Sequence, residues 1–115
     1  MLKDCKPYLQ DILDEISNLR DFSADQNLEK FQADLRTYYA CLRSLEIIGE
    51  AVKRIPAEVR ALYPAVPWRA VAGFRDIAAH DYHNLKPSRV WDIVVTELDS
   101  LELALRSMLK QEADN

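Results

Sequence analysis

Apolar residues recur at the three-and-four spacing of an amphipathic helix along most of this 115-residue chain. No segment alternates between apolar and polar residues with the period of two that marks a half-buried strand. With only two glycines and five prolines, the sequence has no linker or low-complexity tract. The pattern predicts a single domain over residues 1–115, folded as an all-α antiparallel bundle of four main helices plus a short helix.

The apolar stripes place the first two main helices in the N-terminal half. The first begins near Leu9 and ends near residues 18–20, and the second runs from Leu28 to Pro56 as one helix of about 30 residues. Gly49 lies inside the second helix, where a glycine costs about 1 kcal/mol relative to alanine. This cost makes sense if another helix passes close to Gly49. A short helical piece is expected over residues 56–63.

The C-terminal half contains the other two main helices. Two prolines force a loop before the third, which begins at Trp68. This helix is predicted to end near His80 and to be followed by a loop, because helix-poor residues and then Pro87 come next. The last helix starts at Pro87 and carries its apolar stripe to Leu109. We expect Trp68 and Phe74 to lie in the core.

The sequence shows no pattern typical of export, membrane insertion or metal binding. No apolar run approaches the roughly 18 residues that a membrane span requires, and residues 1–5 lack an apolar signal core. We therefore expect a cytoplasmic protein. Cys5 and Cys41 are too few for a disulfide framework and have no second Cys or His at ligand spacing, so we expect two reduced, partly buried thiols and no metal site.

The net charge of −4 is unevenly distributed along the chain. Residues 35–91 carry nine Lys or Arg against five Asp or Glu, whereas the segments on either side each have a net charge of −4. A basic surface on an acidic body attracts a polyanion modestly and in a salt-sensitive way. Arg36 and Arg43 share one face of the second helix, where they could line an RNA groove or be solvated charges.

The segment from Arg75 to Tyr82, RDIAAHDY, carries the residue types best suited to work on a phosphate. Arginine offers a planar fork of donors for phosphate oxygens, histidine exchanges a proton near neutral pH, and tyrosine has a hydroxyl that can bind or be modified. Arg75 and His80 lie about 140° apart on a helix. They share a face only if the helix ends or bends near His80.

This segment and its surroundings resemble the HepT-like branch of the HEPN superfamily over roughly residues 42–101. Members carry an Arg, four residues, a His, any residue and a Tyr, often with a polar residue directly after the Arg, which Asp76 supplies here. The resemblance also rests on residues 44–56, Trp68-Arg69, Gly73-Phe74, Val90-Trp91 and Leu98. It implies a ribonuclease toxin that needs no metal or other cofactor, and a homodimer whose motifs face each other to form a composite site that cleaves RNA.

Cleaving RNA without a metal requires a base for the 2′-hydroxyl, an acid for the leaving 5′-oxygen and a cation for the charge on phosphorus. His80 suits the proton transfers and Arg75 the charge, so we expect these two to be catalytic. Two-fold symmetry could supply a second His80 for the opposite role. Structurally, Arg75 could instead form a salt bridge to Asp76, Asp81 or Glu50. Such a bridge could also orient Arg75 for phosphate, and we expect Asp76 and Asp81 to be supporting residues.

The resemblance implies that Tyr82 accepts AMP from a cognate minimal nucleotidyltransferase of the MntA-like type, which acts as the antitoxin. AMPylation two residues from His80 would place bulk and negative charge where the RNA phosphate should lie. Unmodified Tyr82 could instead stack on a base or pack on a helix.

Other interpretations stay open from the residues alone. The protein could be a non-catalytic helical subunit that binds and regulates a nucleotidyltransferase, or a general helical interaction module. His80 could be a loop imidazole that caps the preceding helix, and His83 is expected on a surface loop. Tyr38, Tyr39 and Trp91 fall on helical stripes and are expected in the core or at a dimer seam, in preference to forming a base-stacking platform.

Overall fold

The structure, a computed structural model, describes residues 4–84 and 86–114. Eight helices follow one another in these ranges: α1 (Lys6–Ser23), α2 (Leu28–Ala33), α3 (Leu35–Lys53), α4 (Ala57–Ala61), α5 (Trp68–Ala72), α6 (Phe74–Asn84), α7 (Pro87–Thr96) and α8 (Leu98–Asp114). No strand occurs in the described ranges, so the predicted all-α class is confirmed. None of the described helices is both long enough and apolar enough to cross a membrane.

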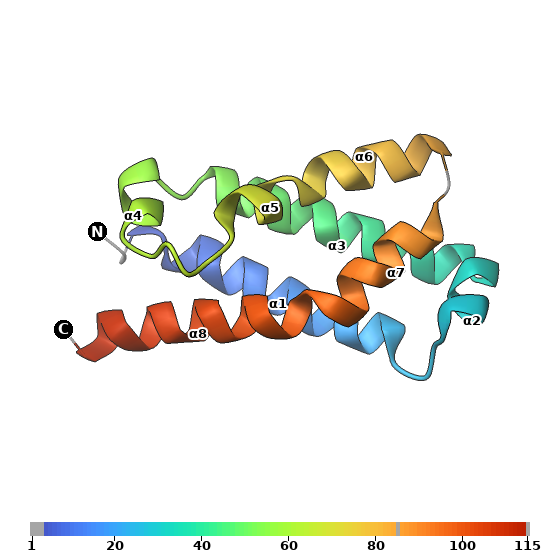
Figure 1. The fold of residues 1–115 in the computed structure, drawn as a ribbon, viewed down its shortest axis with the longest axis horizontal. Coiled ribbons are helices and arrows are strands. Elements are labelled where there is room, and N and C mark those ends of the chain that lie inside the picture. The colour runs from blue at the N-terminus through green and yellow to red at the C-terminus, as the bar shows by residue number, and fades with distance from the viewer. Residues whose placement is uncertain (1–3, 85, 115) are drawn as a thin grey trace.

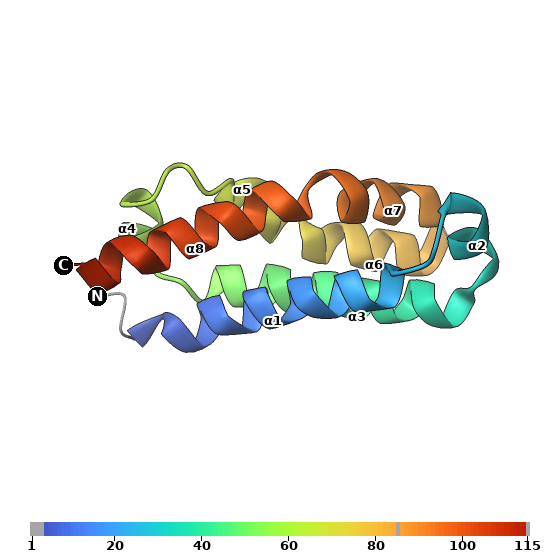
Figure 2. The same ribbon diagram turned by 90° about the horizontal axis from the view of Figure 1, so that it is seen from below.

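The helices form four antiparallel runs along the long axis of an elongated molecule of 47 × 26 × 20 Å (Figure 1). The first run is α1, the second is α2 followed by α3, the third is α5 followed by α6, and the fourth is α7 followed by α8. In Figure 1 α3 lies between α6 and α1, and in both views α8 runs along α1 (Figures 1 and 2). The four runs, with short α4 beyond α3, match the predicted bundle.

The core consists of the apolar stripes that the helical spacing predicts. Leu9, Ile12, Ile16 and Leu19 of α1 are buried and face the buried side of α3. Trp68 and Phe74 are buried as predicted, and both Cys5 and Cys41 are buried. The buried side of α3 consists of Tyr38, Cys41, Leu42, Ser44, Leu45, Ile48, Gly49, Ala51 and Val52.

Three predicted long helices are each divided in two. Asp34 leaves the helical conformation with φ −114° and ψ 85°, and its carboxylate accepts hydrogen bonds from the backbone N–H (3.1 Å) and the hydroxyl (2.7 Å) of Thr37. This N-cap begins α3 anew, so the prediction of one helix from residue 28 to 56 is wrong. A second break at Gly73 separates α5 from α6, and a third at Glu97 separates α7 from α8. None of the three breaks disturbs the apolar stripe, because the chain resumes its helical path within one residue.

The predicted end of the third main helix near His80 is also wrong, because α6 continues to Asn84. The last carbonyls of a helix need partners outside the helical pattern. Here the Asn84 amide donates to the His80 carbonyl (2.9 Å), and the buried Tyr38 hydroxyl donates to the Asp81 carbonyl (3.1 Å). These bonds stabilise the extra turn, so His80, Tyr82 and His83 lie on a helix and not in a loop.

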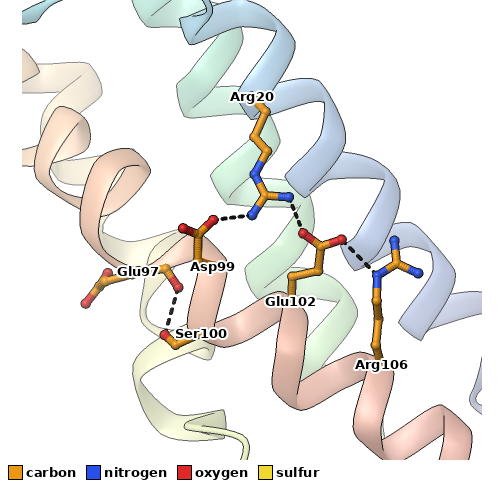
Figure 3. A network of polar contacts seen from close by, with 6 residues as sticks. All are labelled: Arg20, Glu97, Asp99, Ser100, Glu102 and Arg106. Atoms are coloured by element: carbon orange, nitrogen blue, oxygen red, sulfur yellow. Dashed lines mark hydrogen bonds and ion pairs between the residues drawn. The ribbon is translucent and has the colours of Figure 1, made fainter.

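A polar network joins the first and last helices on the surface (Figure 3). The Arg20 guanidinium of α1 bonds both Glu102 and Asp99 of α8, with 2.6 Å to Asp99. Arg106 bonds the other oxygen of Glu102 at 2.8 Å. These bonds lower the pKa of Glu102, the one to Arg20 contributing most. The network fixes α8 against α1 at a distance from the motif helix α6.

Candidate active site

Arg75 begins the motif at the start of α6, where α6 passes closest to α3. A Cβ atom placed on Gly49 of α3 would lie 2.7 Å from the Arg75 backbone nitrogen and 2.8 Å from the Arg75 Cβ. The predicted close passage of another helix at Gly49 is therefore confirmed. Neither glycine has a positive φ, so Gly49 is needed for space and not for backbone conformation.

The Arg75 side chain is half exposed and pairs with Glu50 of α3. Its Nε lies 3.5 Å from Glu50 Oε1, and both side chains are 49% exposed. Of the three acids predicted as partners for Arg75, Glu50 forms the pair in the described structure. A long, exposed ion pair of this kind is weak, so Arg75 can exchange Glu50 for an incoming phosphate at little cost.

His80 lies five residues further along α6 and is exposed. The Asn84 amide approaches its Nδ1 at 3.2 Å and its Nε2 at 3.4 Å. Asn84 also bonds the His80 carbonyl, so the amide, and not the imidazole, caps this end of the helix. The contact between the two side chains holds the imidazole against the last turn of α6, with the ring open to solvent.

Arg75 and His80 lie on opposite flanks of the exposed side of α6. Since α6 continues past His80, the two side chains project about 140° apart. The buried side of α6 consists of Phe74, Ala78 and Asp81. The opposite side is an exposed ridge formed by Asp76, Ala79 and His83. One copy of α6 therefore presents a cation on one flank of this ridge and an imidazole on the other.

Tyr82 lies seven residues after Arg75 and so on the same flank of α6. It is 59% exposed, and its ring stacks on that of Tyr39 from α3 with centroids 5.3 Å apart and planes 30° apart. Tyr38 lies in the core, whereas Tyr39 is 38% exposed, so of its two predicted places the core is wrong and the dimer seam stays a prediction. Adjacent helical residues project about 100° apart, and this signal in the sequence could have separated the two tyrosines.

Asp81 lies between His80 and Tyr82 in sequence but points into the protein, with 0% exposure. Neither carboxylate oxygen has a hydrogen-bond partner in the described structure. Burial raises the pKa of Asp81, and the positive charges of Arg89, His80 and Lys86 oppose this rise. Asp76, the other acid expected in support, is exposed on the ridge.

The described residues contain no group of three or more His, Cys, Asp or Glu side chains placed to hold a metal ion. The motif residues that expose polar groups along α6 are Arg75, Asp76, His80 and Tyr82. Arg36 and Arg43 of α3 are exposed, and Arg43 pairs with Glu46 at 2.6 Å. Together these groups can bind an anion, transfer a proton and contact a base.

Comparisons with known proteins identify the family to which the whole chain is similar. The family model described as "Ribonuclease HepT-like" matches residues 12–108. A protein of Methanocaldococcus jannaschii named as a "Putative RNase" is 40% identical over 84% of this chain and 79% of its own length. The "Probable ribonuclease HepT" of Thermococcus cleftensis is 37% identical over 89% of this chain and 93% of its own length. No solved structure matches the chain.

Proposed function

Because this chain belongs to the HepT-like family of ribonucleases, we propose that it is a metal-independent RNA endonuclease and the toxin of a toxin-antitoxin pair. The observation that carries the proposal is the arrangement of α6, which exposes Arg75 and His80 on the two flanks of one ridge. Cleaving RNA at a phosphate requires both a guanidinium and an imidazole in this mechanism. One helix directs them about 140° apart, so a second copy facing the ridge is the simplest way to bring a guanidinium and an imidazole together.

In the proposed homodimer, two copies of α6 face each other across a two-fold axis and build a composite site. One His80 takes the proton of the 2′-hydroxyl, whose oxygen attacks phosphorus. The His80 of the other copy gives a proton to the 5′-oxygen as the phosphorus–oxygen bond breaks. Arg75 binds the non-bridging oxygens and stabilises their added negative charge. The products are a 2′,3′-cyclic phosphate and a 5′-hydroxyl.

Cleavage by His80→Ala and Arg75→Ala variants tests this mechanism. Each should lose roughly a hundredfold or more of the activity, the usual effect of removing one proton-transfer or charge-stabilising group. Arg106→Ala is the control for Arg75→Ala, because Arg106 is an exposed arginine on α8, outside the motif helix and its exposed ridge. Cleavage should survive EDTA. Full activity in His80→Ala would contradict the mechanism, and no cleavage by the wild type would favour the non-catalytic partner subunit.

Light scattering tests the homodimer. The expected mass is about twice that of the 13.3 kDa chain. A monomer that still cleaves RNA would contradict the composite site.

We also propose that Tyr82 is the residue that an MntA-like nucleotidyltransferase antitoxin modifies with AMP. Its 59% exposure supports this choice over the fully buried Tyr38. With such an enzyme, ATP and Mg²⁺, the intact mass should rise by one or more AMP units as RNA cleavage falls. Tyr82→Phe should block both changes. Peptide mapping that finds AMP elsewhere, or full inhibition of Tyr82→Phe, would point to neutralisation by complex formation instead.

A further inference from the structure

A continuous series of aromatic rings runs from the core to the surface beside the motif. The series consists of Trp91, Phe31, Tyr38, Tyr39 and Tyr82. The distances between the centroids of consecutive rings are 5.2, 5.9, 5.7 and 5.3 Å in that order. Exposure rises along the series from 0% at Tyr38 to 38% at Tyr39 and 59% at Tyr82. The outermost ring, that of Tyr82, stacks on Tyr39, which in turn contacts the fully buried ring of Tyr38.

From this arrangement we infer that Tyr82 is a base-stacking surface for single-stranded RNA and that Tyr39 is the positioning residue that holds its ring. The inference rests on the proposed ribonuclease function and extends it to how the substrate is held. An exposed aromatic ring offers a flat apolar face that any unpaired base can cover. A free tyrosine side chain would lose rotamer freedom on binding, whereas the Tyr39 contact has already restricted the ring of Tyr82.

Charge on the same surface supports a polyanion as the occupant. Arg36 and Arg43 lie three residues before and four residues after Tyr39, so they share its side of α3. Arg75 shares the flank of α6 that carries Tyr82. Three arginines around an exposed pair of aromatic rings match the pattern of a single-strand site, in which cations follow the backbone and rings contact the bases.

Binding measurements in a His80→Ala background separate recognition from cleavage. Fluorescence anisotropy would compare a labelled single-stranded oligonucleotide with a duplex of the same length. Tyr82→Ala should weaken single-strand binding by roughly 5- to 140-fold, the range for losing one stacked base. Tyr39→Ala should produce a smaller loss of the same kind, and neither variant should change duplex binding, because paired bases cannot stack on the ring.

Two variants control for indirect effects. Tyr39→Phe keeps the supporting ring and should restore single-strand binding. Phe22→Ala removes an aromatic ring with the same 38% exposure as Tyr39, but from α1, and should leave binding unchanged. In the cleavage-competent protein, Tyr39→Ala should raise KM with little change in kcat.

Three results would overturn the inference. These are unchanged single-strand binding in Tyr82→Ala, an equal loss on duplex RNA, and dissociation of the dimer in Tyr39→Ala, which would make the rings a protein contact. Each can occur while the wild type cleaves RNA and His80→Ala does not, so the inference can fail without the proposed function. Conversely, a wild type that cleaves no RNA but loses single-strand binding in Tyr82→Ala would remove the proposed nuclease and still support the stacking surface.

Discussion

Replacing Gly49 with alanine should force apart the two helices that position Arg75. The new Cβ would lie 2.7 Å from the Arg75 nitrogen, 2.8 Å from the Arg75 Cβ and 3.1 Å from the Ala72 carbonyl oxygen. A flexible side chain could move away from such a contact. Two of these three atoms belong to the backbone and the third is fixed to it, so relief requires a shift of α6 relative to α3.

The magnitude follows from two opposing effects. Alanine in place of glycine inside a helix gains about 1 kcal/mol of helix propensity. Overpacking a tight contact costs about 1–3 kcal/mol. The net loss of unfolding free energy should reach about 2 kcal/mol, or a fall in Tm of up to about 8 °C for a chain of this size. Cleavage should fall more steeply, because a displacement of about 1 Å in a catalytic group can cost a hundredfold in rate.

Gly73→Ala is the matched control. Gly73 has the right-handed conformation φ −68° and ψ −13°, and a Cβ there would meet the Ala70 carbonyl oxygen at 3.3 Å. This substitution should change the unfolding free energy less than Gly49→Ala does, because no atom lies within 3.0 Å of the new Cβ. Thermal unfolding by circular dichroism at equal protein concentrations, with cleavage of one RNA, compares the two variants. A Gly49→Ala protein as stable and active as the wild type would refute the reasoning.

Three further substitutions test the charges described above. Glu50→Gln should change unfolding free energy by less than about 0.5 kcal/mol, because its pair with Arg75 is exposed, and should strengthen RNA binding in a salt-dependent way by removing a negative charge. Burial raises the pKa of the Asp81 carboxyl above its ordinary value of 3.8, so the folded state holds this proton more tightly than the unfolded state does. Stability should therefore fall as the pH rises from 3.8 through the higher pKa of the folded state. Thermal melts of Asp81→Asn should lack this fall. Arg20 lowers the pKa of Glu102, so the network's contribution is present above the ordinary value of 4.5 and is lost on acidification. Glu102→Gln should therefore cost up to about 1 kcal/mol in melts at neutral pH and almost nothing in acid.

The helical spacing predicted the four runs of the bundle because each stripe reports burial directly. It did not predict the division at Asp34, since a capped break of one residue leaves the apolar pattern unchanged. The end of α6 was predicted wrongly for a different reason. The residues after His80 have low helix propensity, but the extra turn is stabilised by the Tyr38 hydroxyl of another helix, and no local pattern contains that bond.

In the candidate site, too, the features within one short segment were predicted and the contact between two helices was not. The motif itself identified Arg75, His80 and Tyr82, because their chemistry and spacing lie within eight residues. The stack of Tyr39 on Tyr82 depends on how α3 and α6 are aligned. Because the two tyrosines are distant in sequence, the sequence pattern does not predict this alignment. Gly49 was the one sequence signal of that alignment, since its place inside a helix indicated a close neighbour without naming it.

The contacts of α6 imply that the three motif residues are positioned by different parts of the protein. Arg75 and Tyr82 both contact α3, through Glu50 and Tyr39, so the packing of α3 against α6 governs the cation and the aromatic surface together. The His80 side chain is held by Asn84 from within α6, although the turn that carries it is also bonded by the Tyr38 hydroxyl of α3. A substitution at Glu50 or Tyr39, which removes no bond to that turn, should therefore alter substrate binding while leaving the His80 imidazole in place. If His80 transfers protons as proposed, these exposed α3 positions are where RNA affinity can vary without loss of that group.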